Sequence, residues 1–473
     1  MAIYKCSICD TVFDEDKEGR KWDQLDASWS CHVCESGRSM FQCVDQAGGG
    51  ANTTGAGIAG AGSAGAGEAI EEPVRTSETE NYMLDVHQMA ETGESVIEPM
   101  RTRLPGISWD EIFIKGAQLA RIPLDHDRPV NTETVIGPGA KQPLVIDTPV
   151  FVTHMSFGAL SREAKIALAR GSAAARTAMC SGEGGILPDS LEAAHRYIFE
   201  YVPNRYSVTG ENLRKVDAIE IKIGQSVKPG MGGHLPGNKV TGEIAGVRGF
   251  KEGEDIISPS HFEDILTGED LRKKIDWLRE TSGGRPVGVK LAAGNIEADL
   301  EVALPAGPDF ITIDGRAGAT GAAAKFIKAA ASVPTIFALY RARKFLDDRG
   351  AGNVSLIITG GLRVSPDFAK ALAMGADAIA IGTSALMAIG CQQYRICHTG
   401  RCPRGITTQD PGLRAGFDIE RAARGLANFL KVSTGELQHF ARLTGHDDVH
   451  GLSVKDLCTV NSEISGHTGI EHV

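Results

Sequence analysis

Three cysteines near residue 400 carry the clearest chemistry in this sequence. Cys391, Cys397 and Cys402 have the spacing C-x5-C-x4-C and directly follow a short buried-strand pattern at 378–382. Cysteine sulfur ligates iron–sulfur clusters, so three thiolates from one compact loop predict a cluster and redox chemistry. Two alternatives stay open: three ordinary loop cysteines, or a zinc site with His398 as the fourth ligand.

A second group of cysteines lies near the N-terminus. The spacing C-x2-C…C-x2-C predicts a four-thiolate site for zinc or iron, formed by Cys6, Cys9, Cys31 and Cys34. Five aromatic residues would form a small, metal-dependent core: Tyr4, Phe13, Trp22, Trp29 and Phe41. The layout resembles rubredoxin, but Asp10 and Glu35 stand where Gly is usual, and His32 where Pro is usual. The pattern therefore does not distinguish iron from zinc.

Composition limits the classes of function. At 473 residues the chain should form more than one folded unit. Its formal net charge of -11 argues against a nucleic-acid partner, which would need clustered Lys and Arg. We find no apolar run of membrane-spanning length and no signal peptide. Ten cysteines without a secretion signal indicate a reducing compartment, so we expect a cytoplasmic protein.

A Gly/Ala-rich stretch at 47–68 separates the small N-terminal segment from the rest. As a flexible linker it would span about 25 Å, enough for an electron-shuttling domain to reach different surfaces. The alternative is a fused metal-stabilised module of unknown use. The expected organisation is a metal domain at 1–45, a linker at 46–79, a lead-in segment at 80–149 that packs on the next domain, and a large domain at 150–473 with C-terminal helices.

From residue 150 onward, short apolar runs alternate with Gly-rich turns and helical patterns. The runs lie near 150–153, 177–180, 218–223, 287–291, 310–313, 334–338, 355–359 and 377–381. This alternation predicts an α/β protein with a parallel sheet, and eight strands predict a (β/α)8 barrel whose active site lies at the strands' C-terminal ends. The insertion at 181–217 and the segment 224–262 would then lie on the catalytic face. An open doubly wound sheet is the competing architecture.

Two glycine turns follow the last two predicted strands, at Gly360-Gly361 and Gly382-Thr383. Loops at these positions of a barrel commonly bind phosphate through backbone N–H groups, and a side chain would block the anion's approach. They suggest a phosphorylated cofactor, and FMN fits a site beside an iron–sulfur cluster. Ser156 follows the first predicted strand, where exposed backbone could line the flavin ring.

Charged residues at strand ends complete the expected site. Lys290, at the end of the fourth predicted strand, could stabilise negative charge on the flavin. Glu183 lies in a Gly-rich loop after the second strand, and the glycine-rich segment 222–239 carries three lysines. On an acidic protein this loop suggests an anionic substrate such as a dicarboxylate, held by Lys228 and Arg248. The alternative is a flexible surface loop with solvated lysines.

Taken together, several motifs resemble the synthase domain of glutamate synthase in its stand-alone, archaeal-type form. They are MSFGALS, SGEGG, EIKIGQSVKPGMGGHLPGNKV, SPSHFEDILTGEDL and GCQQYRICHTGRCPRGITTQDP. The resemblance implies a (β/α)8 barrel with FMN and a [3Fe–4S] cluster. It also implies reduction of 2-iminoglutarate, formed from 2-oxoglutarate and ammonia, to L-glutamate by hydride delivery from the flavin.

The resemblance also implies roles for individual residues. The cluster ligands would be Cys391, Cys397 and Cys402. The FMN site would consist of Ser156, Gly158, Lys290, Gly315, Gly360, Gly361, Gly382 and Thr383. The catalytic residues would be Lys228, Glu183 and Glu269, and the substrate ligands Arg248, Lys228, Gln225 and His234. Departures from the fused enzymes' pattern, such as Met231 for Glu and His234 for Gln, leave the substrate less firmly indicated than the cofactors.

Features that the sequence lacks suggest partners. The fused glutamate synthases begin with a catalytic cysteine, but this sequence begins Met1-Ala2 and shows no Gly-periodic β-helix pattern or GxGxxG fingerprint. We therefore expect ammonia from solution or from separate glutaminase and β-helix subunits, a protein electron donor such as ferredoxin or a reductase subunit, and a homo-oligomer. Two rival functions are an N-methylglutamate synthase flavin subunit, which resembles this chain but lacks the cluster cysteines, and a non-catalytic flavin and iron–sulfur electron-transfer subunit.

Overall fold

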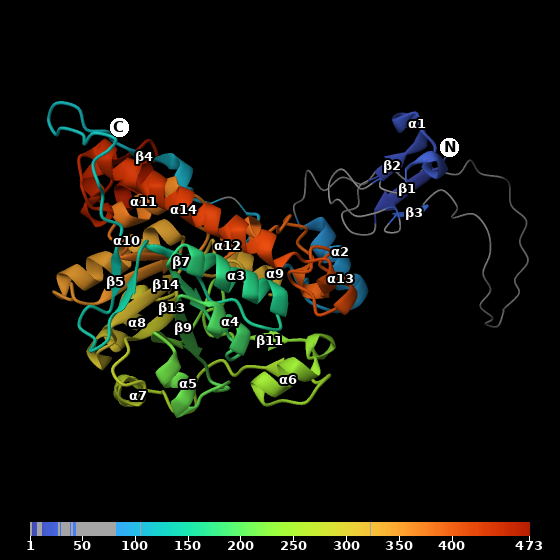
Figure 1. Cartoon of the computed structure of the whole chain (residues 1–473), viewed down its shortest axis with the longest axis horizontal. Coiled ribbons are helices and arrows are strands. Elements are labelled where there is room, and N and C mark those ends of the chain that lie inside the picture. Colours follow the sequence, from blue (N-terminus) through green and yellow to red (C-terminus); the bar gives the residue numbers. More distant parts are fainter. Residues whose placement is uncertain are drawn as a thin grey trace, which may run out of the picture. The chain divides into compact units, whose positions relative to one another are not determined.

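The computed structural model (Figure 1) describes residues 2–6, 12–26, 29, 38, 41–43, 82–104, 106–321 and 323–473. The chain divides into two compact units, Met1–Val96 and Ile97–Val473. The first contains a three-stranded antiparallel sheet in the order β2 (Val12–Asp14), β1 (Ile3–Cys6), β3 (Phe41–Cys43), and the helix α2 (Met83–Thr92).

The expected aromatic core of the small unit is confirmed. Trp22 stacks on Tyr4 with ring centroids 4.4 Å apart, and the rings of Phe13, Trp29 and Phe41 surround it. The four-cysteine prediction falls largely on residues that are not described. Cys9, Cys31 and Cys34 lie outside the described residues, and only the backbone of Cys6 is described.

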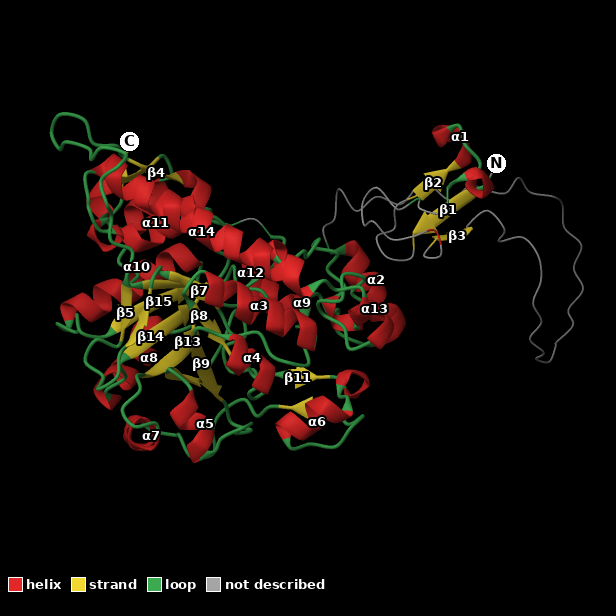
Figure 2. Cartoon of the chain, in the orientation of Figure 1, coloured by secondary structure: helices red, strands yellow, loops and turns green. Residues whose placement is uncertain are grey.

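The second unit is built on a closed barrel of eight parallel strands, which confirms the predicted (β/α)8 architecture (Figure 2). Pairing of the eighth strand with the first, Ala378–Ile381 with Val150–Val152, closes the ring and rules out an open sheet. The strands are short and almost wholly buried, as expected when helices cover a parallel sheet. In chain order they are β7 (Val150–Val152), β8 (Ala178–Cys180), β9 (Arg196–Tyr201), β10 (Ala218–Lys222), β13 (Val287–Ala292), β14 (Phe310–Asp314), β15 (Ser355–Thr359) and β16 (Ala378–Ile381).

One predicted strand was wrong and one was missed. Residues 334–338 begin the helix α10 (Thr335–Asp348), whose buried Ile336, Leu339 and Leu346 recur at helical spacing. The missing strand β9 lies within 181–217, with α4 (Pro188–Ala193) and α5 (Gly210–Lys215), so this segment is not simply an insertion. Its sequence RYIFEY was overlooked because it carries charges. Lys290 consequently lies on the fifth barrel strand.

Helices surround the barrel, with α3 and α14 packed together on one side (Figure 1). Ser161 caps α3 as expected, because its Oγ accepts a hydrogen bond from the Ala164 N–H at 3.2 Å. Among the described helices, none combines the length and apolar character that crossing a bilayer requires. The principal helices are α3 (Arg162–Ala174), α6 (Gly242–Arg248), α7 (Gly268–Thr281), α8 (Ile296–Ala303), α9 (Lys325–Ala330), α11 (Ser365–Ala373), α12 (Thr383–Ala388), α13 (Pro411–Ala415) and α14 (Ile419–Thr444).

The lead-in segment packs on the barrel. The antiparallel strands β5 (Thr134–Ile136) and β6 (Leu144–Ile146) share a buried apolar cluster with Phe151, Ile198 and Phe310. Upstream, β4 (Ile112–Ile114) joins β17 (Leu457–Thr459) and β18 (Glu471–His472) in a small sheet. The C-terminal segment is therefore not only helical as expected, although α14 and α15 (Ser462–His467) form much of it.

Close packing between strands β13 and β14 gives a testable consequence for stability. A Cβ at Gly288 would lie 2.2 Å from Cε2 of the fully buried Phe310 ring. We expect Gly288→Ala to lower the free energy of unfolding by about 1–3 kcal/mol, because the ring must move into a filled core. Thermal and urea unfolding followed by circular dichroism measure this. The control is Gly246→Ala in α6, where no atom lies within 4 Å of the new Cβ, and it should be neutral or slightly stabilising.

Candidate active site

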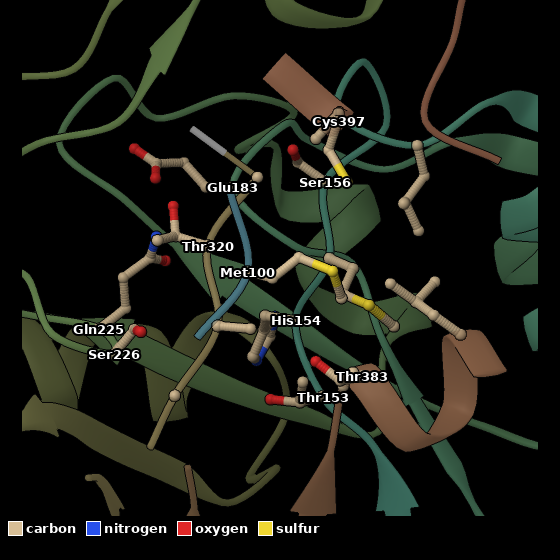
Figure 3. Close-up of a pocket in the computed structure, with 18 of the residues that line it drawn as sticks. Met100, Thr153, His154, Ser156, Glu183, Gln225, Ser226, Thr320, Thr383 and Cys397 are labelled. Carbon is tan, nitrogen blue, oxygen red and sulfur yellow. The ribbon is translucent and has the colours of Figure 1, made fainter. Parts of the chain in front are cut away.

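A pocket of about 360 Å³ lies among the loops that follow the barrel strands. Figure 3 shows Met100 between Glu183, from the loop after β8, and Thr383, the first residue of α12. The pocket brings together most of the residues singled out from the sequence: Ser156, Glu183, Gln225, Lys228, His234, Arg248, Lys290, Gly360, Gly361, Gly382, Thr383 and Cys397. Residues far apart in the sequence therefore meet at the face expected for a barrel active site.

The remaining predicted residues do not line the pocket. Glu269 is exposed in the first turn of α7 and pairs with Arg272 at 3.2 Å, so the structure does not bring it to the other candidates. Gly158 and Gly315 lie behind the wall, where a Cβ would come within 2.8 Å of Leu235 and 2.2 Å of Thr335 respectively. These two glycines permit close packing of the loops rather than direct access to a ligand.

One side of the pocket is rich in buried cations. Lys222 forms an ion pair with Glu183, whereas Lys228 and Arg248, 5% and 7% exposed, have no carboxylate within 4.0 Å in the described chain. The pKa of Lys228 is lowered to about 8, mainly by burial and also by the neighbouring Lys222, while Glu183 opposes the shift. Burial alone would raise the pKa of Glu183, but Lys222 outweighs it and the pKa is lowered.

Arg248 is fixed by contacts on either side of its guanidinium. Nη2 donates to the Phe157 carbonyl at 2.7 Å, and the guanidinium carbon lies 5.3 Å from the centre of the Tyr206 ring. Burial lowers its pKa, and its Nε has no hydrogen-bond partner in the described structure. A rigid, partly unsatisfied guanidinium at a pocket wall is suited to binding a carboxylate.

A buried charge network that the sequence did not reveal adjoins the pocket through His154 and Lys290, which line it. Lys290 Nζ lies 3.8 Å from Glu200 Oε1 and 4.0 Å from Glu220 Oε2. Burial alone would lower the pKa of Lys290, but Glu220 and Glu200 outweigh it and raise the pKa. His154 accepts the Gly182 N–H at Nδ1, at 3.1 Å, so the neutral ring is protonated at Nε2, which lies 3.1 Å from Glu220.

His154, Glu200 and Glu220 also present three potential metal-ligand atoms within 4.8 Å of one another. Lys290 holds a fixed positive charge beside the same two carboxylates. A metal cation there would be repelled by that ammonium, so we assign the cluster to a lysine-centred network and not to a metal.

The glycine turns after β15 and β16 offer free backbone donors. Gly361, Leu362 and Gly382 line the pocket, and their N–H groups have no acceptor within the described part of the chain. Such N–H groups form anion sites, as expected for a phosphate. Glycine at position 361 is needed for packing as well as for the approach of an anion, because a Cβ there would lie 2.5 Å from the Ala317 side chain.

The three cysteines of the loop after α12 lie near one another. All three are free thiols, and Cys397 and Cys402 both raise the pKa of Cys391. Burial is the larger cause and takes the pKa of Cys391 to about 11. Their sulfurs do not gather within 4.8 Å as ligands of a single ion would. A cluster, whose irons each bind one thiolate, fits this wider spacing better than one zinc ion.

A buried lysine that sequence reasoning missed holds the segment at 97–103, which we call the strap. Lys328, fully buried, donates to the Glu98 carboxylate at 2.6 Å and the Met100 carbonyl at 3.0 Å. Arg395, between two of the loop cysteines, donates to the Arg101 carbonyl at 2.6 Å. The strap thus places Met100 against the pocket and connects it to the cysteine loop. Isolated charges separated by over 200 residues gave no sequence signal for these contacts.

A second missed residue, Lys165 of α3, holds two site loops together. Its Nζ donates to the carbonyls of Met155 at 2.9 Å, Cys180 at 3.0 Å and Ser181 at 2.8 Å. Burial lowers its pKa to about 7. The neighbours of these carbonyls, Ser156 and Gly182, belong to the pocket loops after β7 and β8, so Lys165 has a positioning role.

Comparison with known proteins identifies the family. The family model described as "Conserved region in glutamate synthase" matches residues 107–447, well over half of the chain. The chain belongs to the glutamate synthase family. The matched range contains every predicted pocket residue and all three loop cysteines, and excludes the four-cysteine segment.

Relatives of the glutamate synthase family cover most of this chain. The "Glutamate synthase large subunit-like protein" of Rhizobium meliloti is 37% identical over 83% of this chain and 93% of its own length. The "Archaeal glutamate synthase [NADPH]" of Methanocaldococcus jannaschii is 36% identical over 78% of each chain. Among solved structures, a mutant chimera of (S)-mandelate dehydrogenase aligns with a TM-score of 0.48 and 15% identity, covering 74% of this chain and 88% of that chain. At that similarity the match supports no inference about this chain.

Proposed function

We propose that this chain is a glutamate synthase that reduces 2-iminoglutarate, formed from 2-oxoglutarate and ammonia, to L-glutamate. The observation that carries the proposal is a pair of buried cations at the wall of a barrel pocket, Lys228 and Arg248, which have no carboxylate partner among the described residues. Together with family membership, it indicates a substrate that brings the missing carboxylates.

Charge balance supports a dicarboxylate. The cationic side of the pocket carries Lys228 and Arg248, and the Glu183 carboxylate on the same side is already paired with Lys222. A buried charge without a counter-charge is costly, so a ligand with two negative charges would neutralise this side. Gln225 and His234 line the same loop and are proposed to contact the substrate. Glu269 is left out of the proposed catalytic set because it is exposed and paired on α7.

The remaining side of the pocket fits FMN. The unpaired N–H groups of Gly361 and Gly382 provide a phosphate site, and Lys290, which lines the pocket, provides a fixed charge for the ring. We assign Gly360, Thr383 and Ser156 to the same cofactor site. When bound, FMN supplies hydride transfer.

The chain's own residues would then orient the substrate and supply its proton. Arg248, held by Phe157 and Tyr206, would grip one carboxylate and fix the imine carbon against the cofactor site. Lys228 Nζ, whose pKa is about 8, holds a proton at neutral pH yet can release it to the substrate nitrogen. Glu183, although paired with Lys222, raises the pKa of Lys228 and so would favour its charged form.

We further propose that Cys391, Cys397 and Cys402 hold a [3Fe–4S] cluster, supported by their mutual proximity and burial. Electrons would enter from a protein donor, with the four-cysteine segment at 1–45 binding iron or zinc and serving as a tethered carrier across the linker at 46–79. Separate glutaminase and β-helix subunits, a homo-oligomeric state and a cytoplasmic location remain our predictions. The name of the Methanocaldococcus jannaschii relative includes NADPH, which suggests NADPH as the ultimate electron donor and a reductase as the intermediary.

The deciding assay follows cofactor reoxidation after anaerobic photoreduction of the full chain. Addition of 2-oxoglutarate with ammonium should reoxidise the protein and produce L-glutamate, identified by chiral chromatography. Glutamine in place of ammonium should be inactive without a glutaminase partner. Formation of N-methylglutamate from methylamine, at a higher rate than glutamate from ammonium, would instead identify an N-methylglutamate synthase. A protein that binds FMN and turns over with none of these would be an electron-transfer subunit.

A further inference from the structure

Lys239 is a buried lysine that neither the family resemblance nor the proposed mechanism assigns. It ends the short 3-10 helix Gly237–Lys239 and is 6% exposed. This helix belongs to the glycine-rich segment 222–239, which we call the substrate loop. Its Nζ donates to the backbone carbonyl of Cys397 at 2.6 Å. The side chain also runs along Gly400, whose added Cβ would lie 3.1 Å from Lys239 Cε. Lys239 therefore joins the substrate loop to the cysteine loop.

This ammonium has no acidic partner. No Asp or Glu lies within 4.0 Å of Lys239 Nζ in the described part of the chain, in contrast to Lys222 with Glu183 and Lys328 with Glu98. Burial of an unpaired ammonium is costly, and one carbonyl compensates only in part. The group that Nζ contacts instead is the backbone carbonyl of Cys397, one of the three loop cysteines. The missing counter-charge is thus expected at the cysteines.

We propose that Lys239 is the counter-charge of the three-cysteine cluster and raises its reduction potential. The inference rests on the proposed function, because it requires the cluster. A fixed positive charge at close range in a buried site stabilises the more negative, reduced form of a cluster more than the oxidised form. Since Lys239 lines the pocket together with Cys397 and His398, the charge lies between the substrate loop and the proposed electron carrier.

The test is a redox titration of the full-length protein, monitored by the electron paramagnetic resonance signal of the oxidised cluster. In Lys239→Gln the amide can still donate to the Cys397 carbonyl but the charge is lost. The expected result is at least a tenfold shift of the equilibrium toward the oxidised cluster, a fall of about 59 mV for one electron. Lys239→Arg, which keeps the charge, should stay near the wild-type potential.

The matched control is Lys251→Met, on the same loop segment, whose side chain is 83% exposed. It should leave the potential unchanged. An unchanged potential in Lys239→Gln, with iron and sulfide content intact, would overturn the role of Lys239. Loss of the cluster in Lys239→Gln but not in Lys239→Arg supports the counter-charge, and loss in both would overturn it. Absence of a cluster signal in the wild-type protein would instead refute the cluster in the proposed function.

Discussion

Replacing Lys228 with methionine is expected to lower kcat/KM for 2-oxoglutarate by about 10²–10⁴-fold, the usual contribution of a positioned general acid. The side chain is 5% exposed at the pocket wall and has no carboxylate within 4.0 Å in the described chain. Methionine preserves the length and burial of lysine but supplies neither the charge nor the proton. Steady-state rates with a fixed electron donor measure the effect, and FMN absorbance verifies that the cofactor site is intact.

The pH dependence of activity distinguishes loss of the proton that Lys228 donates from a change in the shape of the pocket. Lys228 can donate only while protonated, and burial has lowered its pKa to about 8 from the ordinary value of 10.5. Activity that depends on this group is therefore present below pH 8 and lost as the pH rises through 8, about tenfold per unit. Lys228→Met should lack this limb. The titration of the substrate ammonium affects both enzymes equally. Dividing the wild-type pH profile by the Lys228→Met profile therefore cancels it.

Lys251→Met again provides the matched control, because Lys251 is an exposed lysine that pairs with Glu254 at 3.7 Å on the protein surface. It should retain both the wild-type rate and the alkaline limb. A Lys228→Met enzyme that stays within threefold of wild type, or keeps the same limb, would remove Lys228 from the mechanism. The proton would then have to come from another group in the pocket.

The sequence predicted the barrel and the residues at its strand ends because both depend on local signals. Apolar runs followed by glycine turns identified seven of the eight strands, and these positions brought Lys228, Arg248 and Lys290 to one pocket. The strand β9 was missed because its Glu200 is buried against Lys290 of β13, a pairing made over the intervening strand β10. Residues 334–338 were misread because a short apolar run fits a strand or the start of a buried helix.

Contacts between segments that lie far apart in the sequence could not be predicted, because they leave no local sequence pattern. The strap depends on Lys328 and Glu98, which are isolated charges in the sequence, and Lys165 reaches carbonyls that carry no residue-specific signal. Glu269 was assigned by motif resemblance, but its place on α7 leaves it exposed and paired with Arg272. Local pattern thus located the loops, whereas tertiary packing decided which charges face the pocket.

Replacing Cys397 with serine is expected to abolish the cluster while leaving FMN bound. A hydroxyl is a poor ligand for iron, and three protein ligands leave no spare thiolate to replace it. The proposed phosphate donors, Gly361 and Gly382, belong to separate turns after β15 and β16, so the cofactor site should survive. We expect the [3Fe–4S] resonance to disappear, FMN content to stay near wild type, and turnover with a protein electron donor to fall to background.

The control for this substitution is Cys458→Ser. Cys458 is also a free thiol, and it lies buried in β17 of the small terminal sheet, away from the cysteine loop in the sequence. This variant should keep both cluster and turnover. Metal bound by the four-cysteine segment, iron or zinc, should persist in Cys397→Ser, because its ligands are different cysteines. An unchanged [3Fe–4S] signal in Cys397→Ser would exclude the C-x5-C-x4-C loop as the cluster site, since a missing thiolate must alter the iron that it binds.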